Sequence, residues 1–294
     1  MVAEGKRKRR FIISVVGLLL VILGVLWITV IFPALEKLPL DLDEEFDFDG
    51  TFTVTNPLTG EVDEFPVRIH REWKANGTAD GALLISETMT FTDTDTGEDV
   101  TERYADPSVP AVDRKTREFN PEVDERGREG SWSPPPRLGV GDTFELYHPS
   151  ARGPLPAKVV REEDFRGLNV LVIEVSGENI SLGPNPEAYN MEEYLTEAKI
   201  TMWVEPSSGT VVDEYSLVIR SLDMTGLGLG IEEVYRSVVV YAEETIVDLM
   251  DTAKSAHTML LWFRTILPWI LIGLGAVIVL VDVLVLPRIR ARRE

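Results

Sequence analysis

Two long apolar runs lie near the two ends of the chain. Residues 11–32 contain no charged residue, proline, asparagine or glutamine, and residues 265–286 contain one proline and one acidic residue. An α-helix rises about 1.5 Å per residue, so a helix of this length spans the roughly 30 Å hydrocarbon core of a bilayer. The pattern therefore predicts two transmembrane α-helices, one at each end, which we place at residues 11–33 and 259–287.

The segments outside these runs are basic. Residues 1–10 and 288–294 are rich in lysine and arginine, and short basic segments beside a membrane helix stay in the cytoplasm. We therefore expect a two-pass plasma membrane protein with both termini cytoplasmic. A cleaved signal peptide is the alternative for the first run. That run exceeds the roughly 7–15 apolar residues of a signal sequence, and no small-x-small cleavage motif follows it.

Period-two alternation of apolar and polar residues dominates the region between the runs. It recurs through residues 46–54, 65–69, 194–204 and 211–219, and this period is typical of half-buried strands. Residues 168–175 are nearly all apolar, which predicts a strand buried on both faces. The fold class is therefore mainly β and antiparallel.

The extracellular β domain is placed at residues 34–242. Pro66 cannot donate a ladder hydrogen bond, so its strand is predicted to be an edge or bulged strand. The turns around Gly60, Gly97 and Gly209 share their turn chemistry. Residues 243–258 follow helical spacing and predict an amphipathic helix that leads into the second membrane helix, with its apolar stripe against the β domain.

Charge and cysteine content narrow the possible partners. The chain has a formal net charge of −20 and no cysteine, and because both tails are basic, the acidic excess lies in the central domain. Such a surface repels nucleic acid and attracts cations or basic partners. Without disulfides, a hydrophobic core has to hold the domain. The expected partners are membrane lipid and an envelope or surface-layer component, with a homo-oligomer through the membrane helices left open.

Reactive side chains form no cluster along the sequence. The three histidines, His70, His148 and His257, have no partner at metal-ligand spacing, no cysteine offers a nucleophile, and no phosphate-binding motif occurs. The sequence therefore predicts no enzyme, no catalytic residue and no cofactor.

One acidic segment is a weak calcium candidate. Asp93, Asp95 and Asp99 offer several oxygen atoms, but glycine comes one position early for a helix–loop–helix calcium site and no closing glutamate follows. A polar hairpin tip is the favoured alternative. Asn76 and Asn179 begin glycosylation sequons on the side predicted to be external.

Small and acidic residues in the apolar runs bear on how the two helices pair. Asp282 lies near the inner end of its helix, where it either reaches the lipid head groups or pairs with Arg9 or Arg10. Glycine and alanine allow helices to approach closely. The candidates for such contact are Gly17 and Gly24 in the first run and Gly273, Gly275 and Ala276 in the second.

Five stretches, in order, carry a family resemblance. They are PALEKLP at 33–39, VDRKTRE at 112–118, GDTFEL at 141–146, EEDFRGLNV at 162–170 and WVEPSSGTVVD at 203–213. Between two terminal spans, this series resembles a porin PorA-like domain-of-unknown-function family of two-span envelope proteins. The absence of cysteine is closer to its archaeal than to its actinobacterial members. The resemblance implies an envelope location and supplies no catalytic residue.

Three functions remain open at this point. The leading hypothesis is a non-enzymatic cell-envelope membrane protein whose acidic extracellular domain binds an envelope partner. The second is an oligomeric helical channel, as the family label implies. The third is a lipid-binding carrier, because the WVEPSSG segment between two long strands resembles the curved half-barrels of lipoprotein-sorting carriers. An apolar cavity in the β domain would favour the carrier, and a filled core would favour the partner-binding domain.

Overall fold

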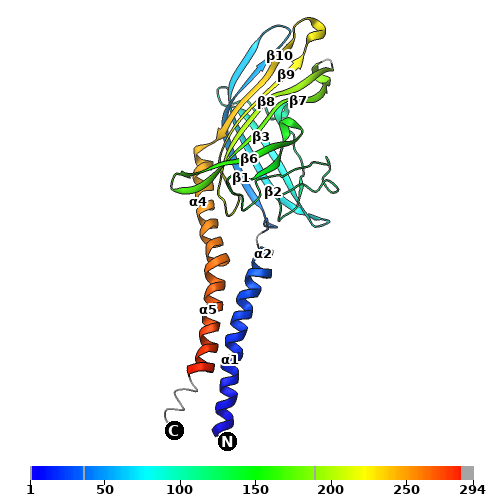
Figure 1. The fold of residues 1–294 in the computed structure, drawn as a ribbon. Coiled ribbons are helices and arrows are strands. Elements are labelled where there is room, and N and C mark those ends of the chain that lie inside the picture. Colours follow the sequence, from blue (N-terminus) through cyan, green and yellow to red (C-terminus); the bar gives the residue numbers. More distant parts are fainter. Residues whose placement is uncertain (1, 36, 189, 286–294) are drawn as a thin grey trace. The chain divides into compact units, whose positions relative to one another are not determined.

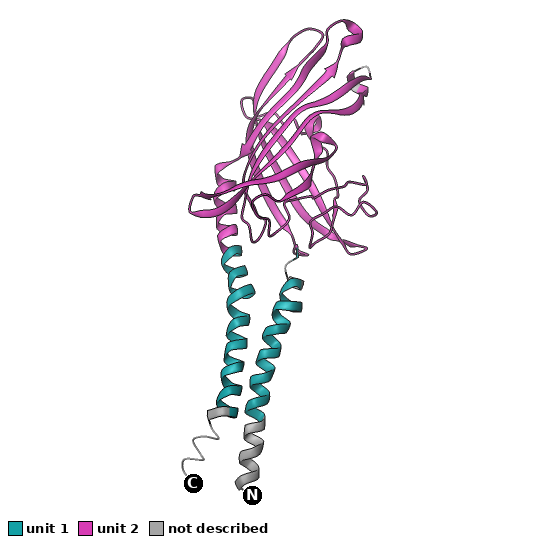
Figure 2. Ribbon diagram, in the orientation of Figure 1, with its two compact units in different colours: residues 1–37, 256–294 teal, residues 38–255 magenta. Residues whose placement is uncertain are grey.

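A computed structural model describes residues 2–35, 37–188 and 190–285. It divides into two compact units, Met1–Lys37 with Ala256–Glu294 and Leu38–Ser255 (Figures 1 and 2). The first unit is helical and the second is built on one antiparallel sheet. The large antiparallel sheet with helices at both ends confirms the predicted fold class at this level.

The helical unit contains both apolar runs. The N-terminal run forms α1 (Val2–Leu26), a π-helical turn η1 (Trp27–Ile31) and the short α2 (Phe32–Leu35). The C-terminal run follows α4 (Glu243–Leu261) as η5 (Trp262–Ile266), α5 (Leu267–Leu280) and η6 (Val281–Val285). By length and composition, Ile12–Ile31 and Glu243–Val283 are each able to cross a membrane, with mean hydropathies of 2.8 and 2.5.

Ten strands form the sheet of the second unit. They are β1 (Asp43–Thr55), β2 (Val62–Ala79), β3 (Ala82–Asp93), β4 (Ala111–Val112), β5 (Thr143–His148), β6 (Gly153–Phe165), β7 (Leu168–Asn185), β8 (Met191–Val204), β9 (Val211–Asp223) and β10 (Ile231–Tyr241). Their spatial order is β4-β3-β2-β1-β10-β9-β8-β7-β6-β5, and every neighbouring pair is antiparallel. Short helices α3 (Thr101–Tyr104), η2 (Pro149–Ala151), η3 (Pro186–Ala188) and η4 (Thr225–Leu227) lie in the connections.

The strand register defines one continuous face across the sheet, called here the inner face. Paired residues lie on the same face. One row of pairs crosses eight strands through Phe144, Ala157, Val175, Ile200, Ser216, Val239, Gly50 and Val67. Every second residue along each strand from this row also belongs to the inner face, except where a bulge shifts the register.

The segment between β4 and β5 bridges the two edges of the sheet. Val112 pairs with Phe119, Glu118 pairs with Ser131, and Ser131 pairs with Leu146 of β5. These isolated bridges lead from one edge strand to the other, so the sheet curls round with its inner face concave. The long curled strands are visible in Figure 1.

The inner face carries most of the hydrophobic core. One buried cluster joins Phe46 and Phe48 of β1 to Tyr241 of β10 and to Ile246 and Met250 of α4. A second cluster covers β5 to β9 and includes Leu155, Ile173 and Ile200 among its buried residues. The apolar stripe of α4 therefore packs against the β domain, because Ile246 and Met250 lie one helical turn apart on one side of the helix.

Of the two alternatives predicted from Pro66, the edge strand is wrong and the bulged strand is confirmed, although the bulge lies between Ala75 and Thr78 and not at Pro66. Strand β2 lies between β1 and β3, and Pro66 pairs with Thr51 of β1. The carbonyl of Pro66 accepts a hydrogen bond from the N–H of Thr94, beyond the last β2–β3 pair, Val67 with Asp93. In a strand the N–H and C=O of one residue point to the same side, so the missing N–H faces the side where the β3 ladder has ended.

Four turns of the β domain share one hydrogen-bonding pattern. In each, the side chain of the first residue accepts an N–H from the third or fourth residue, and the first carbonyl accepts the fifth N–H. The turns begin at Asn56, Asp93, Asp113 and Glu205. The fifth residue has a positive φ, which favours glycine. It is Gly60, Gly97 and Gly209 in three turns, as predicted, but Arg117 with φ 66° in the fourth.

Candidate functional site

Ionisable side chains interrupt the apolar inner face. They include Glu44 of β1 and Glu87 of β3, both paired with Trp73, and Glu193 of β8, paired with Leu222. Arg71 on β2, His148 on β5, and Glu214 and Arg220 on β9 all follow the inner-face register. We call these four residues the inner polar cluster. Each retains partial solvent exposure, with exposed fractions of 23% and 29% for the Arg71 and Arg220 side chains. The concave face is therefore accessible to solvent at this cluster, although its apolar neighbours are buried.

Arg71 lies among aromatic rings and has a weakly held guanidinium. Its Cζ is 5.1 Å from the centre of the Phe48 ring and 5.8 Å from that of Trp73. Its nearest carboxylate oxygen is on Glu87, 3.8 Å from Nε, which is beyond hydrogen-bond distance. Glu87 already accepts a 3.0 Å hydrogen bond from Trp73 Nε1. The buried Nε of Arg71 has no hydrogen-bond partner, and an unsatisfied buried donor costs about 1–3 kcal/mol.

Arg220 repeats this environment on another strand. Its Cζ lies 5.7 Å from the centre of the Tyr235 ring, and its Nη1 is 3.6 Å from Oε1 of Glu193. Glu193 is the direct partner of Arg152, whose Nη2 donates to its other carboxylate oxygen at 3.2 Å. The buried Nε of Arg220 likewise has no hydrogen-bond partner. Both inner arginines thus carry a donor that the protein does not use.

His148 lies within electrostatic range of both arginines. Burial, together with the positive charges of Arg71 and Arg220, lowers the pKa of His148 to about 4. Its Nδ1 accepts a 3.2 Å hydrogen bond from the N–H of Ser150, so the neutral ring carries its proton on Nε2. Six strands lie between β2 and β5 in the sheet order. The electrostatic effect of Arg71 on His148 therefore requires the concave curvature described above.

Glu214 completes the cluster on the side of the α4 attachment. Burial raises its pKa, while Arg71 opposes this rise and Asp213 adds to it. Burial also raises the pKa of Tyr241 well above its ordinary value, and Glu214 contributes to that shift. The cluster thus combines two cationic donors and a neutral imidazole with the carboxyl group of Glu214, whose pKa burial raises. This combination suits recognition of an anion within apolar surroundings.

The weak calcium candidates are committed to local structure. The carboxylate of Asp93 accepts hydrogen bonds from the N–H of Asp95, the N–H of Thr96 and the Thr96 hydroxyl. Asp99 accepts the N–H of Thr101 at the start of α3. Among the residues that the structure describes, no three His, Cys, Asp or Glu side chains gather as a metal site. This geometry is that of the polar hairpin tip.

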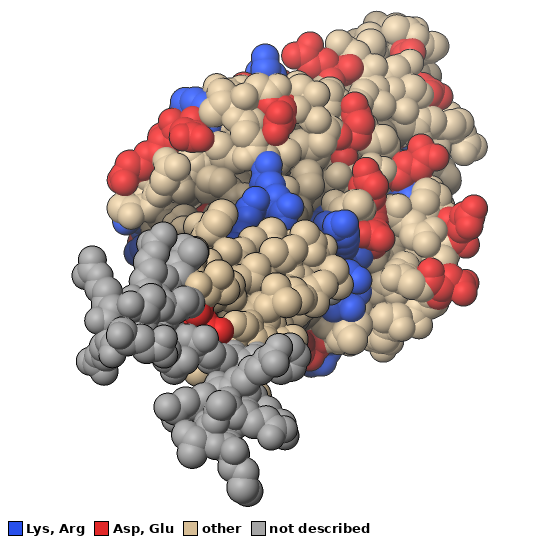
Figure 3. All heavy atoms as spheres, turned by 60° about the horizontal axis from the view of Figure 1, so that its bottom comes forward, with Lys and Arg blue, Asp and Glu red and all other residues tan. Residues whose placement is uncertain are grey.

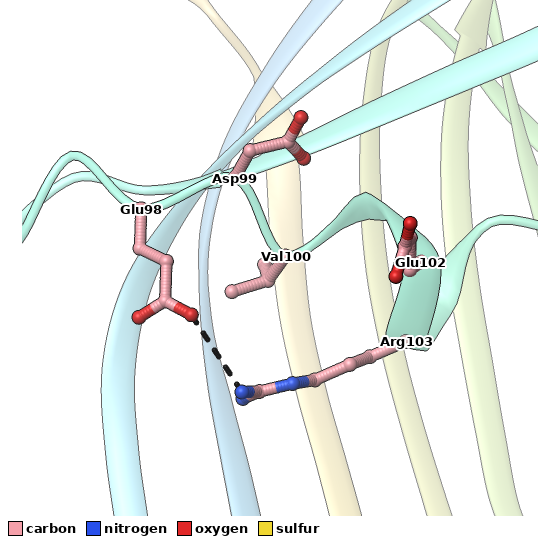
Figure 4. Close-up of a pocket in the computed structure, with 5 residues that line it drawn as sticks. All are labelled: Glu98, Asp99, Val100, Glu102 and Arg103. Carbon is pink, nitrogen blue, oxygen red and sulfur yellow. Dashed lines mark ion pairs between the residues drawn. The ribbon is translucent and has the colours of Figure 1, made fainter.

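A shallow surface pocket adjoins this hairpin. It is lined by residues 98–100, Glu102 and Arg103, and the ion pair between Glu98 and Arg103 spans it at 3.6 Å (Figure 4). The Asp99 side chain points away from this ion pair in Figure 4. The pocket therefore does not unite the three calcium candidates.

The sequon asparagines both lie on the surface. Asn76 is exposed at the bulge of β2, and Asn179 is exposed in β7 with a φ of 52°. Both positions are sterically accessible to modification. The remaining histidines are separate from the inner cluster, since His70 pairs with Asp47 at 2.9 Å and His257 is exposed on α4.

Asp282 has a partner that the sequence analysis did not assign. The hydroxyl of Ser14 donates a 2.5 Å hydrogen bond to its carboxylate, and the Asp282 residue is 8% exposed. The side chains of Arg9 and Arg10 lie outside the part that the structure describes, so their predicted pair with Asp282 stays a prediction. Ser14 was identifiable as one of the few polar residues in the first run.

Glycines bring the two apolar helices together. A Cβ at Gly275 would lie 2.5 Å from the carbonyl oxygen of Gly17, and one at Gly24 would lie 2.6 Å from Ile272. Gly273, in contrast, faces open space. At the opposite end of the pair, Trp27 Nε1 donates to the Phe263 carbonyl at 2.7 Å and their rings stack at 6.1 Å.

Sequence reasoning missed the inner polar cluster as a group. A signal was present, because Arg71 continues the apolar phase of Phe65, Val67 and Ile69, and Glu214 occupies the phase of Val212 and Val218. A charge on the buried face of a strand is unusual. Which of these charges meet across the sheet depends on its curvature, and the linear pattern does not contain that information.

Comparison with known proteins identifies the family. The family described as "Porin PorA" matches residues 11–284. This chain belongs to the porin PorA family. No curated protein matches the PorA-family chain significantly. Among solved structures, it is similar to a DUF1329 family protein from Desulfovibrio piger, at 8% sequence identity over 69% of this chain and 86% of that chain. The TM-score is 0.16, so this likeness carries no argument about shape or function.

Proposed function

We propose that this PorA-family chain is a non-enzymatic, two-pass membrane protein of the cell envelope. In this proposal both tails lie in the cytoplasm and the β domain lies outside, where it binds an envelope partner. The chain supplies two apolar helices, basic tails beyond them and an acidic domain between them. The family assignment supports the envelope location.

One observation carries the membrane part of the proposal. Along the helix pair, most of the exposed residues that do not face the partner helix are large and apolar. Ile12 and Leu18 of α1 are 59% and 55% exposed, and Leu274 and Val277 of α5 are 52% and 56% exposed. Water would be an unfavourable neighbour for such a continuous apolar surface, whereas acyl chains would cover it.

The strands are not proposed to line a pore through the membrane. A membrane β-barrel presents an apolar band to lipid and a polar lumen. Here the inner face is largely apolar, while Asp49 and Arg68 form an ion pair on the opposite face of β1 and β2. Acidic side chains are also spread over the visible face of the domain in Figure 3. This polarity favours a domain that stands in water.

A helical channel receives little support from the described part of the spans. The polar side chains Ser14 and Asp282 contact each other, and Thr29 donates to the carbonyl of Val25 in its own helix. Apart from Arg264 and Thr265 at the start of the second span, the exposed surface that is left for contacts between copies of the pair is mainly apolar. Conductance of the purified protein in a planar bilayer would overturn this part of the proposal.

The lipid-binding carrier is kept as a second candidate because of the inner polar cluster. A closed hydrophobic core has no need for two arginines with unpaired donors, whereas a ligand site inside a curled sheet does. The accessible cluster is therefore the observation that favours ligand binding by the β domain.

Protease protection tests the topology. Full-length protein with an epitope tag on each tail is expressed in intact cells, and protease is added from outside. We expect loss of the β domain and survival of both tags until the membrane is permeabilised. Digestion of either tag in intact cells would contradict the proposal. Photo-crosslinking from exposed β-domain positions in native envelopes then tests whether a partner is present, with positions on the cytoplasmic tails as control.

A further inference from the structure

Two arginines on the inner face of the curled sheet each have a buried Nε atom without a hydrogen-bond partner. The Nε atoms of Arg71 and Arg220 are both buried and both without a hydrogen-bond partner. Their nearest acidic groups, Glu87 and Glu193, stand at 3.8 and 3.6 Å, too far for hydrogen bonds. Buried donors in native proteins are nearly always satisfied. A pair of unsatisfied guanidinium donors on one concave face thus indicates an absent acceptor.

The two guanidinium groups act electrostatically on one region of the interior. Arg71 is on β2 and Arg220 on β9, and both act electrostatically on the same imidazole, His148 of β5. Arg71 also acts on Glu214 and Tyr241. Side chains from four strands therefore lie within electrostatic range of one another over the concave face, although β2 and β5 lie far apart in the sheet.

The surroundings define what kind of anion would fit. Arg71 lies over the Phe48 and Trp73 rings, and Trp73 in turn lies 4.3 Å from Trp132 between ring centres. Arg220 lies over Tyr235. These aromatic residues offer apolar surface beside each cation, so an anion that carries a hydrocarbon chain would bury that chain at the same site.

The planar guanidinium group of arginine matches the geometry of an oxyanion. A guanidinium presents its Nε–H and Nη–H donors in one plane, at the spacing of two oxygens of a carboxylate or phosphate. His148 is neutral, and its Nε2–H is a further donor because Nδ1 is occupied by Ser150.

We propose that Arg71 and Arg220 bind a phosphate or carboxylate group inside the curled sheet, with the aromatic inner face beside them holding the chain of an anionic amphiphile. This inference rests on the β domain being the ligand-binding part of the protein, as proposed above. It does not depend on the direction of the membrane helices. A failed topology test would therefore leave it intact, and a failed binding test would leave the topology intact.

Calorimetry on the full chain in neutral maltoside micelles tests the site. The probes are dodecyl phosphate and inorganic phosphate, with dodecyl trimethylammonium as the cationic control. We expect saturable binding of dodecyl phosphate and none of the cation. Tighter binding of dodecyl phosphate than of inorganic phosphate identifies an amphiphile as the source of the anion, and equal binding identifies a soluble anion.

Matched substitutions connect the binding to the arginines. Arg71→Met and Arg220→Met are expected to weaken binding at least tenfold, and Arg161→Met, which removes an exposed arginine paired with Glu163, is expected to leave it unchanged. Arg71→Lys keeps the charge without the fork, so it is expected to weaken binding as well while preserving the fold. Melting temperatures of the ligand-free variants separate this role from a structural one.

The outcomes decide the proposal. An arginine whose role is to bind a ligand destabilises the ligand-free protein. Its replacement by methionine is therefore expected to leave the melting temperature unchanged or raise it. The absence of saturable binding for both phosphate probes would overturn the proposal. So would binding that Arg71→Met, Arg220→Met and Arg71→Lys all leave unchanged.

Discussion

The guanidinium of Arg117 donates a 2.5 Å hydrogen bond to the carbonyl oxygen of Ser208, 91 residues later in the sequence. The same guanidinium donates to the carbonyl of Pro134 at 3.3 Å. Burial lowers the pKa of Arg117 to about 10, so it stays charged at neutral pH. Two stretches that carried the family resemblance, residues 112–118 and 203–213, thus meet at one side chain.

The first prediction concerns this contact. Arg117→Met is expected to destabilise the protein by about 2–3 kcal/mol, because the carbonyl oxygens of Pro134 and Ser208 lose a charged hydrogen-bond donor. Arg117→Gly is expected to cost about 1 kcal/mol less, because glycine relieves the left-handed φ of 66°. Denaturant unfolding of the full chain in micelles, followed by tryptophan fluorescence, measures both.

The control for this prediction lies in the same turn. Lys115 is exposed, so Lys115→Met is expected to change stability by less than about 0.5 kcal/mol. Equal stability of parent and Arg117→Met would show that the contact contributes nothing to stability.

The second prediction concerns pH. The folded pKa of His148, about 4, lies below the ordinary value of 6.5, so the unfolded state binds the proton more readily between these values. Stability should therefore fall as pH decreases from about 6.5 to about 4, by up to roughly 3 kcal/mol from this group. His148→Gln should remove that part of the pH dependence.

Other charges face His148, so the comparison is between variant and parent. Arg71 and Arg220 remain charged throughout this range, and the raised pKa of Glu214 acts in the opposite direction. Melting temperatures from pH 7 to pH 4 measure the difference. Parallel curves for parent and His148→Gln would contradict the buried neutral imidazole.

The third prediction concerns the helix pair. Because the chain has no cysteine, Trp27→Cys and Phe263→Cys place a single reporter pair where two rings now stack. Gly275→Ala puts a methyl group 2.5 Å from the Gly17 carbonyl and should reduce disulfide formation severalfold. Gly273→Ala is the matched control, since nothing lies within 4 Å of its Cβ position. Equal crosslinking in the two alanine variants would contradict the close contact.

The fourth prediction concerns the Ser14–Asp282 hydrogen bond. Ser14→Ala, Asp282→Leu and the double variant form a double-mutant cycle, read by crosslinking of the same reporter pair. We expect a coupling of about 0.6–2 kcal/mol, the range of interhelical hydrogen bonds in membranes. Additive effects of the two substitutions would show that the contact does not stabilise the pair. Asp282→Asn retains an acceptor for the hydroxyl and should behave more like the parent.

The sequence by itself determined the elements of this protein. Period-two alternation marked the strands around Phe46, Phe48 and Ile69. Burial of one face of a strand imposes that period, whatever the curvature of the sheet. Helical spacing marked Ile246 and Met250 of α4, and unbroken apolar runs marked the helices. Turn chemistry is equally local, and it identified the glycines at three of the four related turns.

Only the tertiary structure decided which distant residues meet. Strand order placed Pro66 on an internal strand. The β3 ladder ends beside Pro66, so no ladder hydrogen bond requires an N–H group at this position. Helix contact gave Asp282 the hydroxyl of Ser14. Curvature brought Arg71 of β2 within electrostatic reach of His148 on β5. Such contacts depend on strand order, register and curvature summed over many residues, and no local stretch of sequence contains those quantities.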